Sequence, residues 1–247
     1  LFRSSSTCPV STTNLNKAPG TGAGTGWTTP GNILLNDNNN ATVSLANSTS
    51  SSALTATGFN FNIPANATIV GIQASISRFG ANTSLQDNNV SLLKAGVTSG
   101  SNKAATGTGW PATEAVATYG STSDLWGTTW TPSDVNASNF GVSLIVANTA
   151  ATGAARTATV DYVDLTVTYT LPGTVNWYTV SSGGSTIGSG YTFNPVGVAS
   201  SGLSNTNTAG TFTYFAECST NPGCRTAANF VIKPSTAITA QPQSVAI

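Results

Sequence analysis

The chain has 247 residues, of which 39% are hydrophobic and 6% are charged, with eight basic and eight acidic side chains and no His or Met. Because globular domains carry about 25% charged residues, this charge content excludes a nucleic-acid binder that neutralises phosphates with Lys and Arg clusters. It also excludes a calcium cage of many carboxylates. The apolar fraction suits a folded protein, and no apolar run approaches the roughly 18 residues of a membrane helix, so we expect no membrane insertion.

Residues 1–30 show neither the period of a strand nor that of a helix, and they are rich in Gly, Pro, Ser and Thr. We therefore expect an extended arm or linker here. The chain lacks Met and begins without the pattern of a signal peptide, which indicates a processed chain or a piece of a longer one.

Short apolar runs alternate with clusters of turn residues over residues 31–171. Three runs place apolar residues at every second position, which is the period of a half-buried strand. They are Val70, Ile72, Ala74 and Ile76; Phe140, Val142, Leu144 and Val146; and Val163, Leu165, Val167 and Tyr169. About eight such strands predict an all-β sandwich or jelly-roll module. One helical turn is expected after Thr131 as N-cap, with Pro132 at its first position.

A second, smaller set of strand patterns occupies residues 172–235 and predicts another all-β module. Residues 236–247 then have the pattern of a linker and one strand without a partner. A tandem array explains this tail, either as the first strand of a following domain or as a strand added to a neighbouring copy.

The second module resembles a known family at WYTVSSGGSTIGSGYTFNP (177–195), TAGTFTYFAEC (208–218) and GCRTAANFVIK (223–233). In order and spacing it is similar to the Ig-like repeats of very large secreted surface proteins of Bacteroidetes-type bacteria, whose next repeat opens with a motif like ITAQPQSV (238–245). It departs from them because the end of the first module replaces the strands that should precede the Trp. The first module is more weakly similar to β-sandwich domains of the same kind of protein.

This resemblance implies an Ig-like β-sandwich for the second module and export by the type IX secretion route. It also implies an extracellular, cell-surface protein that serves as a repetitive stalk or adhesin, including those used in gliding motility. No catalytic activity is implied for the first module.

Cys218 and Cys224 flank a turn with Gly and Pro between two expected strands, close enough for a disulfide, and we predict that they pair. Three cysteines also allow Cys8 to pair with either of them or with a neighbouring chain. A zinc site is not expected without His or a CxxC motif. We predict no cofactor and no metal.

Trp110, Trp126 and Trp130 lie outside the clear alternation, so they are candidates for a ligand platform that stacks on sugar rings. The competing expectation, which we favour, is that these rings pack under loops or cap the ends of the sandwich, since one Trp buries up to about 250 Å².

The acidic residues do not predict catalysis. Asp161 and Asp164 are the only close pair, and three residues apart in a strand they point to opposite faces unless a bulge intervenes. No His exists for a catalytic triad, so we predict that the chain is not an enzyme. Asp37 among Asn residues, and Asp87 beside Asn88 and Asn89, have the oxygen ligands of a calcium site, but Asx turns explain both clusters.

The sequence therefore favours a structural or adhesive module of a long extracellular fibre or multidomain adhesin. Its expected partners are neighbouring domains or copies of the same protein. The alternative is a carbohydrate-binding accessory region of a secreted enzyme, with surface polysaccharide as the partner.

Overall fold

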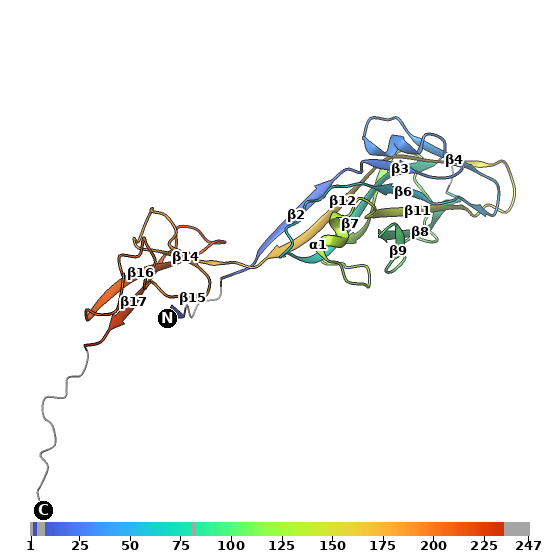
Figure 1. The fold of residues 1–247 in the computed structure, drawn as a ribbon. Coiled ribbons are helices and arrows are strands. Elements are labelled where there is room, and N and C mark those ends of the chain that lie inside the picture. The colour runs from blue at the N-terminus through green and yellow to red at the C-terminus, as the bar shows by residue number, and fades with distance from the viewer. Residues whose placement is uncertain (1, 4–7, 81–82, 235–247) are drawn as a thin grey trace, which may run out of the picture. The chain divides into compact units, whose positions relative to one another are not determined.

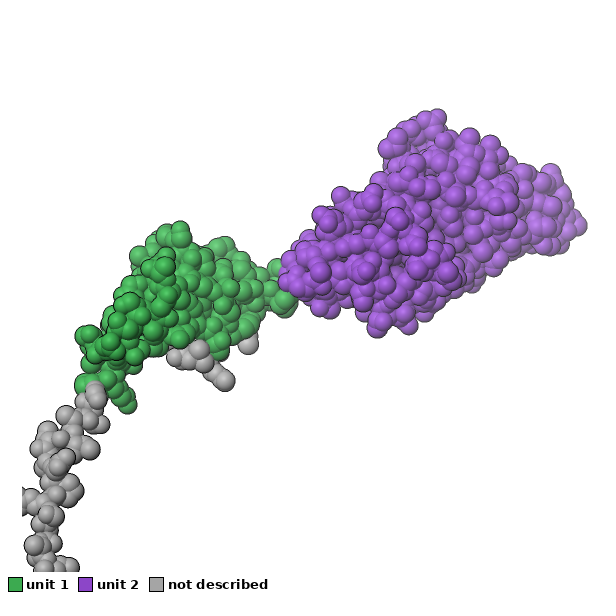
Figure 2. Space-filling model, in the orientation of Figure 1, with its two compact units in different colours: residues 1–11, 172–247 green, residues 12–171 purple. Residues whose placement is uncertain are grey.

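The computed structural model describes residues 2–3, 8–80 and 83–234 (Figure 1). The chain forms two compact units, one of residues 12–171 and one of residues 1–11 with 172–247, which Figure 2 colours separately. The chain therefore passes from one unit to the other twice. In sequence terms, the larger unit is inserted between two parts of the smaller one.

The larger unit is built from two β-sheets. One sheet has the order β10 (Ala115–Ser121), β7 (Thr68–Gly80), β12 (Arg156–Leu171) and β2 (Ser11–Lys17), with β4 (Ala41–Leu45) also paired to β12. The other has the order β3 (Thr21–Ala23), β6 (Leu54–Thr57), β11 (Gly141–Asn148), β8 (Leu85–Lys94) and β9 (Val97–Ser99), with β5 (Thr49–Ser50) paired to β11. Both sheets contribute side chains to one hydrophobic core, so the predicted all-β sandwich-type fold is confirmed.

The predicted alternation is confirmed in β11 and β12. Val142 and Leu144 of β11 and Val163, Leu165 and Val167 of β12 are each at most 3% exposed. Successive strand residues point to opposite faces of a sheet, so these side chains all face the core. Burying each of them stabilises the fold by about 1.5–3 kcal/mol.

Val70 departs from the predicted pattern because β7 contains a bulge. Gly71 and Ile69 pair with successive residues of β12, so Val70 is an extra residue with no partner in the register. Ile69 is 4% exposed and takes the buried position, while Val70 is only partly buried. A bulge shifts by one residue which side chains face the core, and a strict every-second-residue pattern does not predict such a shift.

The prediction of an arm or linker over residues 1–30 is wrong for residues 12–30, which belong to the sandwich. β2 lies beside β12 and β3 lies beside β6. Trp27 is 6% exposed, and Ile33 in the 3-10 helix η1 (Pro30–Leu34) is fully buried. β2 carries one apolar residue, Leu15, so it joins the sheet through backbone hydrogen bonds and shows no hydrophobic period.

The predicted helical turn is confirmed as α1 (Pro132–Asn136). Thr131 Oγ1 accepts a hydrogen bond from the Asp134 backbone N–H at 3.2 Å, and the Asp134 carboxylate accepts one from the Thr131 N–H at 2.9 Å. This capping box satisfies donors that a helix start leaves open. No helix in the described ranges has the length and apolar character needed to cross a membrane.

The smaller unit is also all-β. One sheet has the order β14 (Gly188–Ser189), β13 (Val175–Tyr178), β16 (Gly210–Cys218) and β17 (Thr226–Ile232), and a second pairs β1 (Phe2–Arg3) with β15 (Thr192–Phe193). Phe193 joins the two sheets, since its ring stacks on Trp177 at 5.4 Å and meets Tyr214 edge-on at 6.1 Å between centroids. The strand predicted within residues 236–247 lies outside the described residues.

The predicted pairing of Cys218 with Cys224 is wrong. A disulfide joins Cys8 to Cys218, whose Cα atoms are 5.4 Å apart, and Cys224 is an exposed free thiol. The segment after Cys8 docks on the smaller unit, where Thr220 Oγ1 donates to the Pro9 carbonyl at 2.9 Å. The prediction favoured cysteines close in sequence, but this docking brings together two cysteines that are 210 positions apart.

Candidate functional site

The three tryptophans proposed as a ligand platform are buried. Trp110, Trp126 and Trp130 are 1%, 0% and 6% exposed. A ring that stacks on a sugar must present its face to solvent, so the platform hypothesis is wrong for these residues. They pack inside the larger unit, as the competing expectation held.

Trp126 is buried although it belongs to a loop and not to a strand. Its backbone adopts the left-handed conformation with φ of 59°, and its N–H donates to Asp124 Oδ1 at 2.7 Å. The indole Nε1 donates to the Ile72 carbonyl of β7 at 2.8 Å. The loop thus folds its largest side chain against β7, a strand that lies between β10 and β12, and no hydrophobic period marks this loop.

Trp130 closes one end of the core. Its ring meets Phe140 edge-on at 5.4 Å, and its Nε1 donates to the Leu125 carbonyl at 3.0 Å. Lys94 Nζ lies 5.5 Å from the ring centroid, a cation–π contact. The indole N–H groups of Trp27 and Trp177 also donate to backbone carbonyls, so all five tryptophans have an internal partner.

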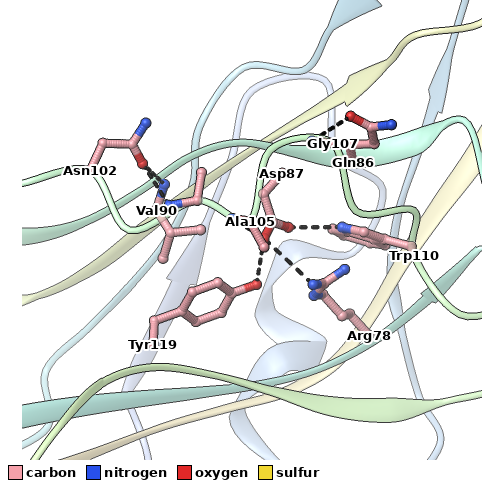
Figure 3. A network of polar contacts seen from close by, with 10 residues as sticks. Arg78, Gln86, Asp87, Val90, Asn102, Ala105, Gly107, Trp110 and Tyr119 are labelled. Atoms are coloured by element: carbon pink, nitrogen blue, oxygen red, sulfur yellow. Dashed lines mark hydrogen bonds and ion pairs between the residues drawn. The ribbon is translucent and has the colours of Figure 1, made fainter.

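The main polar cluster inside the sandwich surrounds Asp87 of β8 (Figure 3). Oδ1 of Asp87 accepts from Trp110 Nε1 at 2.8 Å. Oδ2 accepts from the Tyr119 hydroxyl at 2.9 Å and from the Ala105 backbone N–H at 3.1 Å. Arg78 Nη2 of β7 lies 3.5 Å from the same oxygen. We call these four side chains, Arg78, Asp87, Trp110 and Tyr119, the Asp87 network.

Arg78 carries the positive charge of the Asp87 network. It is 5% exposed, and its guanidinium carbon lies 4.5 Å from the centroid of the Trp110 ring. Its Nε and Nη1 have no hydrogen-bond partner among the described residues. The buried cation is therefore held by one carboxylate and one aromatic face.

Tyr119 acts as a fixed donor in the Asp87 network. Burial raises the pKa of its hydroxyl, and the negative charge of Asp87 raises this pKa further. Both causes disfavour the phenolate beside an existing anion. The hydroxyl thus stays protonated and keeps its hydrogen bond to Asp87 at neutral pH.

The Asp87 network connects the two sheets of the sandwich, since Asp87 lies on β8 and its partners Arg78 and Tyr119 lie on β7 and β10. A general base or nucleophile needs a lone pair that a substrate can reach. Both oxygens of Asp87 already accept from internal donors, and the residue is 2% exposed. Its geometry supports the fold and offers no site for a reaction or for the calcium ion considered above.

The other acidic cluster considered for calcium also has an internal explanation. Asp37 Oδ1 accepts from the Asn39 backbone N–H at 3.0 Å, and Oδ2 accepts from Asn39 Nδ2 at 2.9 Å. These hydrogen bonds, which form an Asx turn, lower the pKa of Asp37. Within the described part of the chain, no three His, Cys, Asp or Glu side chains gather as a metal site.

Comparison with known proteins adds little to this geometry. No protein-family model matches the chain, and no curated protein matches it. Among solved structures, a chain of a cyanophage Pam1 capsid asymmetric unit is similar at 22% identity, over 67% of this chain and 87% of that chain, with a TM-score of 0.26. A TM-score this low carries no argument, so the functional conclusion rests on the residues of this chain.

Proposed function

We propose that this chain is a non-catalytic structural module of an extracellular, cell-surface fibre or multidomain adhesin. The observation that carries this proposal is that the side chains best suited to bind a ligand are used for internal contacts. All three candidate tryptophans are buried, and both oxygens of Asp87 accept hydrogen bonds from internal donors.

Two further features support the proposal. The chain has a formal net charge of zero with 6% charged residues, so its polar groups are mostly uncharged hydroxyls and amides and its charge favours no partner of a particular sign. The disulfide between Cys8 and Cys218 suits an oxidising environment outside the cell. The expected partners are neighbouring domains or further copies of the same protein.

Immunogold electron microscopy with antibodies against the full chain tests the location. Intact cells that make the protein should be labelled on their surface or on fibres, and brief protease treatment of intact cells should remove the label. Material released in this way should carry Cys8 linked to Cys218 in a non-reduced digest. Label that requires permeabilised cells, together with reduced cysteines, would overturn the proposal.

A further inference from the structure

β12 contains a second bulge, and its extra residue is a buried aspartate. Val160 of β12 pairs with Arg78 of β7, and the next pair is Tyr162 with Ser77, so Asp161 has no partner in the register. The Asp161 residue is 0% exposed. A carboxyl group thus lies beneath the surface at the point where the ladder between β7 and β12 is interrupted.

Neither oxygen of this carboxyl group accepts a well-formed hydrogen bond from the described residues, although the Asn38 backbone N–H approaches it and lowers its pKa. Asp87, which is equally buried, has donors on both oxygens. Moving an ionised carboxylate out of water without a partner costs far more than folding can supply. Asp161 therefore requires either a proton or a positively charged ligand.

The groups around Asp161 add negative charge. Burial raises the pKa of Asp161, and the carboxyl group of Glu114, through its charge and a hydrogen bond, and more weakly the charge of Asp37 raise it further, while the Asn38 backbone N–H acts in the opposite direction. Glu114 immediately precedes β10, is exposed, and accepts a hydrogen bond from the Ser77 hydroxyl. One carboxylate therefore lies at the surface beside the buried one.

Asn40 supplies a third oxygen without a donor. Ala41 of β4 pairs with Val160, so Asn40 and Asp161 each directly adjoin a residue of this pair. Asn40 Nδ2 donates to the Asn38 carbonyl at 3.0 Å, which fixes the orientation of the amide. Its Oδ1 is buried and has no partner in the described part of the chain.

We propose that Asp161, Glu114 and Asn40 form a binding site for one calcium ion. The site offers two carboxylates and one amide oxygen, and neither Asp161 nor Asn40 Oδ1 accepts a well-formed hydrogen bond from the described residues. Calcium takes 6–8 oxygen ligands in irregular geometry, whereas magnesium demands a near-ideal octahedron and keeps several waters. Such a mixed, partly exposed oxygen set suits calcium, and surface waters complete its coordination through the exposed side of Glu114.

Calorimetric titration of the full chain with calcium chloride, after removal of metals with EDTA, tests the site. One ion should bind per chain with a Kd of about 10⁻⁴–10⁻³ M, as in other sites with few charged ligands. Calcium in excess should raise the melting temperature of the larger unit, because the ion binds only the folded state. Magnesium at the same concentration should bind at least about tenfold more weakly.

Asp161→Asn separates the calcium site from a merely protonated carboxyl group. It should abolish calcium binding and the calcium-dependent rise in melting temperature, while leaving the melting temperature in EDTA unchanged or higher. The matched control is Asp164→Asn on the same strand, where the amide keeps the acceptor for Asn16 Nδ2, now 2.7 Å from Asp164 Oδ1. This variant should bind calcium normally.

Glu114→Gln keeps the test decisive if Asp161→Asn fails to fold, because Glu114 is exposed. This variant should weaken calcium binding at least about tenfold. The proposal is overturned if the unaltered chain binds no calcium, or if the folded Asp161 or Glu114 variant binds calcium as tightly as the unaltered chain.

Discussion

At the scale of single residues, the stability of the larger unit depends on how its buried charges are paired. The Asp87 network places one anion and one cation between the sheets and gives the anion two further side-chain donors. A buried pair of this kind adds little compared with apolar packing, but breaking it is costly because the remaining charge stays buried. Substitutions within the network should therefore have far larger effects than substitutions in surface pairs.

Asp87→Asn tests this expectation. The substitution leaves Arg78 as a buried cation without a carboxylate, and it should lower the free energy of unfolding by about 3–5 kcal/mol. Urea unfolding followed by tryptophan fluorescence measures the change. Lys103→Gln is the control, because Lys103 pairs with Asp124 at 2.8 Å near the surface and should cost at most about 1 kcal/mol. Equal effects of the two substitutions would contradict the role given to the Asp87 network.

A carboxylate of the smaller unit makes its stability depend on pH. Glu217 Oε2 accepts from Arg225 Nε at 2.6 Å, and Oε1 accepts from the Gly223 N–H at 3.0 Å. These hydrogen bonds lower the pKa of Glu217 below its ordinary value of 4.5. The unfolded chain then binds the proton more readily than the folded chain, so this contribution is complete above pH 4.5 and is lost as the pH falls through the folded pKa.

Glu217→Gln should flatten this pH dependence. Melting curves of the variant and of the unaltered chain between pH 7 and pH 3 should converge for the smaller unit as the pH falls. A constant difference across that range would show that Glu217 does not titrate with unfolding.

At the scale of elements, the sequence predicts the strands well and their irregularities poorly. Leu165 and Val167 predict β12, because successive residues of a strand face opposite sides of the sheet and apolar residues at every second position therefore all face the core. The bulges at Val70 and Asp161 are properties of pairs of strands, so one strand's pattern does not contain them. The burial of Trp126 escapes prediction for a similar reason, since its partner Ile72 lies 54 residues away.

The bulge in β7 also brings two backbones into close contact. A Cβ added to Gly71 would overlap the backbone carbonyl of Thr122 and come within 2.5 Å of the Ser123 nitrogen. Gly71→Ala should therefore destabilise the larger unit by about 1–3 kcal/mol, measured by urea unfolding. Gly31→Ala, which meets no atom within 4 Å, should leave the stability nearly unchanged. A neutral Gly71→Ala would mean that the bulge relaxes without cost.

The register of the β16–β17 hairpin would allow a different disulfide, between Cys218 and Cys224. Ala216 pairs with Thr226, and continuing this register places Cys218 opposite Cys224. The Glu217–Arg225 ion pair of 2.6 Å, one step before the cysteines, is consistent with such a continuation. In the structure Cys218 is bonded to Cys8 instead, and Cys224 is an exposed free thiol.

With Cys8 replaced in the variant Cys8→Ser, Cys218 should be free to form a disulfide with Cys224. A non-reduced digest analysed by mass spectrometry should then contain Cys218 linked to Cys224. Cys224→Ser, as the control, should retain the bond between Cys8 and Cys218. Two free thiols in the folded Cys8→Ser variant would contradict the continued register.

At the scale of the whole molecule, the disulfide encloses most of the chain. It joins residues separated by 210 positions, so all of the larger unit and strands β13–β16 lie within the covalent ring. Within the larger unit, Asn14 meets Thr168 and Asn16 meets Asp164, so β2 runs antiparallel to β12 and the chain enters and leaves that unit at neighbouring points. While the larger unit stays folded, the loop that the disulfide closes is therefore effectively short, so closing it costs less conformational entropy than 210 positions suggest.

This ring also decides which parts of the protein carry mechanical load. When the chain is stretched by its two ends, tension passes from Cys8 directly to Cys218 through the sulfur atoms, and the larger unit carries none of it. Of the described strands, only β1 and β17 lie outside the ring and can be pulled away while the bond is intact. After reduction, complete unfolding of the enclosed residues would release a further length of about 700 Å, at roughly 3.4 Å for each of the 210 positions. A chain pulled from both ends would therefore keep its larger unit folded for as long as the disulfide is intact.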